Sequence, residues 1–111
     1  MTTNKALLSR GDVWWYEPER SGRRPYLILT RDSAIAFLHQ VLAVPATRTI
    51  RDIPTEVAIG PADGMPATCC LTLDNVTVIR PALCTALVTR LSPARMREVC
   101  DALALATGCA R

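Results

Sequence analysis

The 111-residue sequence predicts one domain of the mostly β (α+β) class, a small antiparallel barrel or curled sheet followed by a C-terminal helix. Two observations support this class. Apolar runs of strand length recur at short intervals between Gly, Pro and charged clusters, and the final segment changes to helical periodicity. Half of the residues are apolar, which gives a chain of this length a real but thin core. We therefore expect a partner subunit.

The first predicted strand carries an unusual aromatic pair. Period-2 alternation places Val13 and Trp15 on one face and Trp14 and Tyr16 on the other. One tryptophan must therefore lie outside the main core. It packs against the C-terminal helix or a dimer partner, or it forms a stacking surface for a nucleic-acid base. The seven predicted strands span residues 12–17, 25–30, 40–46, 54–59, 68–73, 76–79 and 84–90.

Two helices are expected. A short inserted helix over 32–38 could be capped by Asp32 or Ser33. The C-terminal helix has Ser92 as its cap, Pro93 in its first turn and Gly108 as its stop. Its expected apolar stripe is Met96, Val99, Cys100 and Leu103, and its expected water-facing residues are Arg95, Arg97 and Asp101.

The charged residues indicate which ligands the protein binds, and the cysteines indicate whether it holds a metal. The net charge is +3, and 12 of the 13 cationic residues are Arg, which favours bidentate contacts with phosphate or carboxylate. A GC-rich coding sequence would give the same bias. The five cysteines form no metal-ligand pattern with His39, the only histidine. We expect no metal or other cofactor, and reduced thiols that mostly fill the core, with Cys109 the most reactive.

No apolar run approaches the roughly 20 residues that span a bilayer. The N-terminus also lacks the apolar segment of a signal peptide. We expect a cytoplasmic protein that does not contact membranes.

Two segments carry candidate site residues. In SGRRPYLILTRD, Pro25 opens a strand and places two arginines at its mouth, as a solvated loop end or an anion site. In AVPATRTIRDIPTEV, Thr47 ends a strand and runs into a loop that carries Arg48 and Arg51, a plausible phosphate cradle. Asn75 either forms a turn or reads a base edge. His39 is a less favoured general base.

The motifs RGDVWWYEP, GRRPYLILTRD, VLAVPATRTIRDIPTEVAI and LTLDNVTVI, in this order, resemble the MazF/PemK family of toxin endoribonucleases. The resemblance implies an SH3-like barrel, a homodimer and cleavage of single-stranded RNA. It also implies a cognate antitoxin whose acidic, disordered C-terminal segment folds along the dimer groove.

By the same resemblance, Arg24 and Thr47 match the family's catalytic pair. We expect further RNA contacts from Ser21, Arg23, Arg48, Arg51 and Asn75. Glu19 or water would take the 2′ proton. The loop between the first two strands is shorter than is usual in the family, and a threonine replaces a usual arginine at position 77. Two other functions are considered, a CcdB-like gyrase poison on the same fold and a catalytically silent RNA-binding module.

Overall fold

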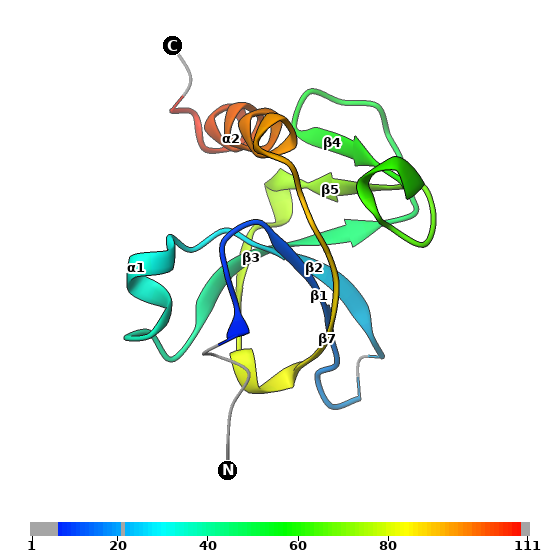
Figure 1. The fold of residues 1–111 in the computed structure, drawn as a ribbon. Coiled ribbons are helices and arrows are strands. Elements are labelled where there is room, and N and C mark those ends of the chain that lie inside the picture. The colour runs from blue at the N-terminus through cyan, green and yellow to red at the C-terminus, as the bar shows by residue number, and fades with distance from the viewer. Residues whose placement is uncertain (1–6, 21, 110–111) are drawn as a thin grey trace.

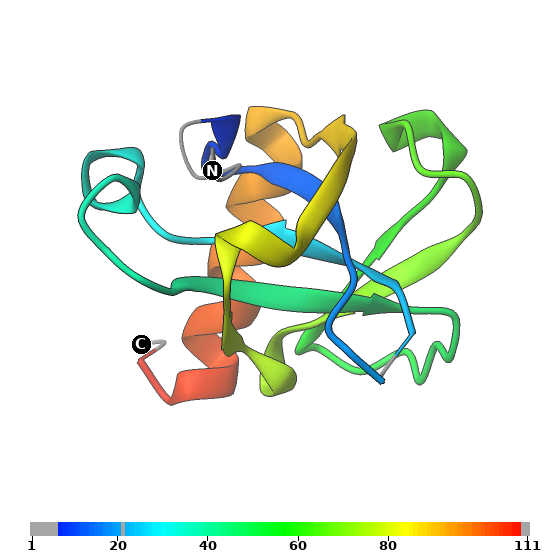
Figure 2. The same cartoon turned by 90° about the horizontal axis from the view of Figure 1, so that it is seen from below.

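The computed structural model describes residues 7–20 and 22–109. Seven strands form one curled antiparallel sheet, and a long helix, α2, packs across it (Figures 1 and 2). The strands are β1 (Asp12–Tyr16), β2 (Arg24–Ile28), β3 (Val41–Thr47), β4 (Glu56–Ile59), β5 (Cys69–Thr72), β6 (Thr77–Ile79) and β7 (Cys84–Arg90). The helices are α1 (Asp32–Ile35) and α2 (Pro93–Thr107). Among the described residues, no helix is long and apolar enough to cross a membrane.

The sheet has the strand order β4-β5-β3-β2-β1-β7, and β6 pairs with the first half of β3. The predicted mostly β fold is confirmed, and every strand lies within two residues of its expected bounds. Within the described chain, however, no ladder joins β4 to β7. The sheet is therefore curled and barrel-like but open, with these two strands as its edges.

The core has two parts, one on each face of β1. Val13 belongs to the larger cluster, which α2 covers through Val99 and Ala102. Trp14 and Tyr16 belong to the second cluster. Trp15 is half-buried and belongs to neither. The prediction that one tryptophan lies outside the main core is thus confirmed. Trp14 lies in the second cluster, and Trp15 lies in neither cluster.

The Arg-Gly-Asp segment, residues 10–12, leads into β1 and connects it by hydrogen bonds to other parts of the fold. Gly11 has a positive φ of 93°, a conformation that glycine adopts without steric cost. Its N–H donates to the carbonyl of Ile28 at 2.9 Å, and its carbonyl accepts from the N–H of Leu91 at 3.0 Å. Arg10 donates through Nη1 to the carbonyl of Leu29. These bonds tie the start of β1 to the end of β2 and to the segment before α2.

The buried side chain of Asp12 adds further hydrogen bonds to this segment. Its side chain is 1% exposed and accepts from the N–H of Ser9 at 2.9 Å, from Nε1 of Trp14 at 3.2 Å and from Nε of Arg90 at 3.0 Å. Burial of a carboxylate is unfavourable unless it is paired in this way. The acid is therefore required by the fold, not by the chemistry of the site described below.

Replacing Asp12 with alanine should lower the free energy of unfolding by about 2–4 kcal/mol, because the indole of Trp14 and the N–H of Ser9 lose their buried acceptor. Asp101→Ala is the matched control. It removes an exposed aspartate of α2 and should change the free energy of unfolding by about 0.5 kcal/mol or less. Urea unfolding of both variants measures the difference, and equal losses would contradict this role for Asp12.

Helix α2 begins and ends where the sequence predicted. The hydroxyl of Ser92 accepts from the N–H of Arg95 at 3.1 Å, and Pro93 is the first helical residue. Gly108 ends the helix with a φ of 73°. One apolar position was wrong, because Cys100 is exposed and Ala102 is buried in its place.

The predicted polar face of α2 also needs one correction. Arg97 and Asp101 are exposed, as predicted. Arg95 is half-buried, and its Nε lies 2.9 Å from Oδ1 of Asp63 in the turn after β4. The hydrogen bond from Arg95 lowers the pKa of Asp63. This ion pair fastens α2 to the loop that precedes β5.

Helix α1 is shorter than predicted, and its predicted cap is wrong. Arg31 occupies the N-cap position, and no side chain caps the helix. Asp32 instead accepts, through Oδ1, from the N–H of Arg10 at 2.7 Å. The tertiary contact with the segment before β1 therefore takes the carboxylate that a local cap would have used.

Candidate functional site

The two strongest candidates, Arg24 and Thr47, lie at neighbouring strand ends. In the antiparallel pair of β2 and β3, Tyr26 lies opposite Pro45. Extending this register by two residues places Arg24, the first residue of β2, opposite Thr47, the last residue of β3. Two residues that are 23 positions apart in the sequence therefore meet at one edge of the fold.

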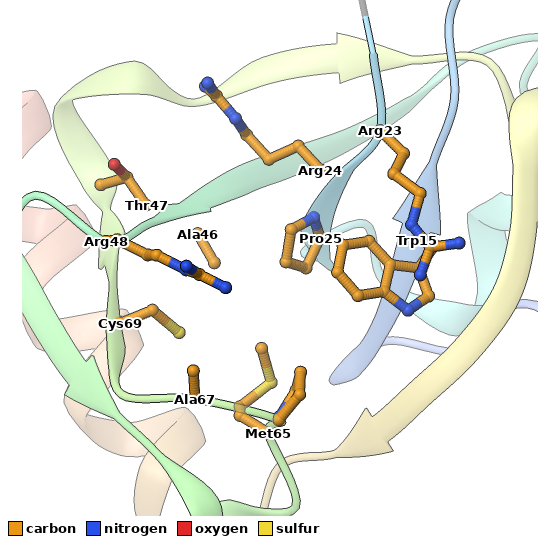
Figure 3. Close-up of a pocket in the computed structure, with 11 residues that line it drawn as sticks. Trp15, Arg23, Arg24, Pro25, Ala46, Thr47, Arg48, Met65, Ala67 and Cys69 are labelled. Atoms are coloured by element: carbon orange, nitrogen blue, oxygen red, sulfur yellow. The ribbon is translucent and has the colours of Figure 1, made fainter.

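Two pockets adjoin at this position. The first has a volume of about 380 Å³ (Figure 3). It is lined by Trp15, Arg23, Arg24, Pro25, Ala46, Thr47, Arg48, Met65, Pro66, Ala67 and Cys69. The second has a volume of about 230 Å³ and is lined by Arg24, Pro45, Thr47, Thr49, Arg51, Thr72 and Asn75. Arg24 and Thr47 are the two residues that line both.

The pockets differ in chemistry because they open on opposite sides of β3. Ala46 lines the first and Pro45 lines the second, as strand alternation requires. The first pocket opens from the larger core cluster, to which Ala46, Met65 and Cys69 belong. It therefore has an apolar floor below a rim of arginines. The second pocket has hydroxyl and amide groups in addition to its arginines.

Arg24 is exposed at the mouth of β2, directly before Pro25. Among the described residues, its guanidinium makes neither a hydrogen bond nor an ion pair. Its donors are therefore free for a ligand. Proline restricts both its own φ and the backbone of the residue before it. The backbone of Arg24 is thus fixed by the strand and by Pro25, while its side chain extends over the junction of the pockets.

Thr47 has its hydroxyl in a defined orientation. Oγ1 accepts a hydrogen bond from the N–H of Thr49 at 3.2 Å. A hydroxyl that accepts in this way still has its own proton to donate. The residue is half-buried at the end of β3. Its hydroxyl can therefore donate to an anion at the junction of the two pockets.

Three more arginines surround this pair, each in a different state. The guanidinium carbon of Arg23 lies 4.0 Å from the ring centroid of Trp15. Arg48 is exposed and lies at the wall of the first pocket (Figure 3). Arg51 is paired, with its Nε 3.2 Å from Oε2 of Glu56. Among the described residues, Arg24 and Arg48 make no hydrogen bond or ion pair. An anion at this site therefore meets these two arginines and Arg23, which lies over the ring of Trp15.

The pair formed by Arg51 and Glu56 holds the loop between β3 and β4. The backbone N–H of Arg51 also donates to Oε1 of Glu56 at 2.9 Å. Partial burial raises the pKa of Glu56, but the hydrogen bonds from Arg51 outweigh it, and the net pKa is below its usual value. The carboxylate thus stays ionised and neutralises part of the charge of Arg51.

The structure gathers the predicted RNA-contact residues at the two pockets. Arg23 and Arg48 line the first, and Arg51 and Asn75 line the second. Asn75 also ends a 3-10 turn, so it serves as a turn residue and a pocket residue at once. Ser21 lies outside the described residues. The sequence did not predict Met65, Pro66 and Ala67 as pocket residues, because apolar residues in a loop carry no chemical signal.

Two candidate bases lie elsewhere. Glu19 and His39 line neither pocket. His39 is exposed before the start of β3, whereas Thr47 ends that strand. At about 3.3 Å per strand residue, the length of β3 separates them by about 20 Å. His39 therefore does not reach an anion at Thr47 within the same chain.

The thiols divide into a buried and an exposed set. Cys69, Cys70 and Cys84 are buried, and Cys100 and Cys109 are exposed. Burial raises the pKa of Cys70 and of Cys84 to about 11, so both are neutral thiols near pH 7. Within residues 7–20 and 22–109, no cluster of three or more His, Cys, Asp or Glu side chains forms a metal site.

Comparison with known proteins extends these observations. The family described as "PemK-like, MazF-like toxin of type II toxin-antitoxin system" matches residues 9–107. The sequence is 41% identical over 107 residues to a probable endoribonuclease MazF5 of Mycobacterium tuberculosis, covering 96% of this chain and 98% of that protein. It is 34% identical over 103 residues to a probable endoribonuclease MazF2 of the same species, covering 92% of this chain and all of that one.

The fold also matches a solved structure. A mycobacterial endoribonuclease, determined in complex with its cognate antitoxin, superposes with a TM-score of 0.84 and 32% sequence identity. The match covers 94% of this chain and 98% of that one. The similarity therefore extends over the strands that carry both pockets and over α2.

Proposed function

Because the chain belongs to the PemK-like, MazF-like family of type II toxin-antitoxin toxins, we propose that it is an endoribonuclease that cleaves single-stranded RNA. The observation that carries this proposal is the placement of Arg24 opposite Thr47 where two pockets meet. The scissile phosphate lies at this junction, and the flanking nucleotides extend into the pockets on either side.

The reaction is transesterification within the RNA. The 2′-oxygen attacks the adjacent phosphorus, a phosphorane with extra negative charge forms, and the 5′-oxygen leaves with a proton. Arg24 stabilises the phosphorane and supplies the proton to the leaving oxygen, because a fixed cation aimed at developing charge lowers the barrier. The hydroxyl of Thr47 keeps its proton and donates a hydrogen bond to a non-bridging oxygen of the phosphorane. Arg24 does not act as the base, because its protonated guanidinium has no lone pair that could accept a proton.

The position of Glu19 favours water as the acceptor of the 2′ proton, because Glu19 lines neither pocket. Every step then uses only protein groups and water. We propose that no metal or other cofactor takes part, and that the products carry a 2′,3′-cyclic phosphate and a 5′-hydroxyl. Cleavage is sequence-selective because the second pocket offers hydroxyl groups, Arg51 and Asn75 to a base edge.

The physiological setting follows from the family. We propose that the protein acts in the cytoplasm, where cleavage of cellular RNA inhibits translation and growth. A cognate antitoxin neutralises it by laying an acidic, disordered C-terminal segment over the same arginines. Arg24 and Arg48 are exposed, and complementary charge speeds and directs such an encounter. The mycobacterial structure shows a related endoribonuclease with its own antitoxin.

Two other functions receive less support. A gyrase poison of the CcdB type would use the C-terminal end of its helix instead of a pocket at Arg24 and Thr47. A silent RNA-binding module would not need the hydroxyl of Thr47 to keep a free proton, as it does here. Relatives named as endoribonucleases, at 41% and 34% identity, also favour cleavage.

We propose that the active form is a homodimer. Leu42 of β3 and Val78 of β6 are paired across the sheet and both exposed. Phe37, just after α1, is 84% exposed. A second copy would shield such an apolar surface from water. Sedimentation at micromolar concentration should give the mass of two chains, and a monomer that cleaves RNA at full rate would contradict the proposal.

Cleavage in the presence of EDTA tests the proposed chemistry. The purified protein should cut single-stranded RNA equally well with EDTA and with added Mg²⁺. The Arg24→Ala variant, prepared in parallel, excludes a contaminating nuclease. Cleavage that depends on added divalent metal, or that is equal in the variant, would contradict the proposal.

A further inference from the structure

Trp15 is a tryptophan of β1 whose side chain lies outside both core clusters. It is half-buried. Its strand neighbour is Pro25, the residue after Arg24. Its indole forms a wall of the first pocket (Figure 3). The ring thus lies beside the proposed scissile phosphate without any role in the core.

Arg23 covers this indole. Its guanidinium carbon is 4.0 Å from the ring centroid, the geometry of a cation–π stack. Among the described residues, Arg23 makes no hydrogen bond or ion pair, and it is exposed. A planar guanidinium on an indole occupies the same space as a nucleobase stacked there. Base stacking on an aromatic ring is in general stronger than an exposed cation–π contact.

The pocket in front of Trp15 fits such a base. Its volume of about 380 Å³ lies at the lower end of the range for small-molecule sites. Its floor is apolar, with Ala46, Met65 and Cys69 from the larger core cluster. A flat, weakly polar ring is suited to this floor, whereas a phosphate is suited to the arginines at the rim.

We propose that Trp15 is the stacking platform for a nucleobase next to the scissile phosphate, and that Arg23 is a placeholder which the base displaces. Once displaced, Arg23 turns to the RNA backbone and pairs with a phosphate, where its planar fork makes bidentate contacts. Base entry is thus coupled to a new backbone contact. This inference rests on the proposed function, because it assigns a subsite of the same RNA-binding surface.

Tryptophan fluorescence in a Thr47→Ala background, which binds RNA with little cleavage, tests the stacking. Free nucleosides and short single-stranded RNA should quench the emission of Trp15. Trp15→Phe should remove this quenching, because the remaining Trp14 is buried in the second core cluster. RNA with an abasic residue at the nucleotide that stacks should bind without quenching. Quenching that persists in Trp15→Phe, or that no abasic position abolishes, would overturn the proposal.

The Arg23→Ala variant tests whether Arg23 is a placeholder or only part of the pocket wall, because the two roles predict opposite changes in the affinity for free nucleosides. Without its competitor, Trp15 should bind free nucleosides about two- to fivefold more tightly. The same variant should bind RNA more weakly, and the slope of log K against log salt should become shallower by about 0.7, the value for one lost phosphate contact. Weaker binding of nucleosides by Arg23→Ala would overturn the exchange.

Arg97→Ala is the matched control, since Arg97 is an exposed arginine of α2 that lines neither site pocket. It should leave nucleoside binding and the salt slope unchanged, and a change equal to that of Arg23→Ala would assign the effect to net charge. If the wild-type protein cleaves RNA but nucleosides do not quench the emission of Trp15, the stacking subsite is refuted and the proposed function is not. Absence of cleavage by the wild-type protein would instead refute the proposed function.

Discussion

Replacing Arg24 with alanine should lower RNA cleavage by at least about a hundredfold, the loss expected when a preorganised group that stabilises developing charge is removed. The fold should tolerate this change. Arg24 is exposed at the first position of β2, and among the described residues its guanidinium has no partner to lose. Thermal stability and sedimentation should therefore stay close to wild type.

Arg24→Lys sharpens this test. It keeps the positive charge but replaces a planar fork with a point charge on a flexible stem, so it should restore little activity. Arg97→Ala should cut RNA at the wild-type rate, because Arg97 lies on α2 and lines neither pocket of the site. Single-turnover cleavage of one RNA compares the variants. Normal cleavage by Arg24→Ala would remove Arg24 from the chemistry.

Replacing Thr47 with alanine is the second change with a large expected effect. It removes the hydroxyl that accepts a hydrogen bond from the N–H of Thr49 at 3.2 Å and still has its own proton to donate. Loss of one donor to the phosphorane should slow cleavage by about a hundredfold. Thr47→Ser keeps the hydroxyl and should retain most of the activity. Single-turnover rates at saturating enzyme separate this effect from weaker RNA binding.

Thr107→Ala is the control for Thr47→Ala. Thr107 lies in the last turn of α2, where its hydroxyl bonds to the carbonyl of Leu103 at 2.8 Å. Its removal should leave the cleavage rate unchanged. If Thr47→Ser were as inactive as Thr47→Ala, the methyl group or the strand end would matter, and the hydroxyl would not be the donor.

Much of the fold was predictable because the deciding signals are local. Alternation in β1 separated Trp14 from Trp15, and Ser92 with Gly108 fixed both ends of α2. The errors arise from tertiary contacts. Asp32 did not cap α1 because Arg10 uses its carboxylate. Cys100 faces outward, where Nη2 of Arg10 donates to its sulfur at 3.2 Å.

The site was predictable in part. Arg24 and Thr47 came from the family resemblance, and a proline at a strand mouth and a hydroxyl at a strand end gave each a physical reason. That the two lie face to face depends on the register of β2 and β3, which is set by long-range pairing. The loop with Met65 and Ala67 was missed, because only the curl of the sheet brings it to the pocket.

The chemical nature of the RNA ends, determined after cleavage in EDTA, decides whether Arg24 and Thr47 act on a phosphorane formed by the 2′-oxygen. We expect a 2′,3′-cyclic phosphate on every upstream fragment and a 5′-hydroxyl on every downstream fragment. Neither end should accumulate with Arg24→Ala. Fragments that carry a 3′-hydroxyl and a 5′-phosphate, or that form only with a divalent metal ion, would contradict the proposed mechanism.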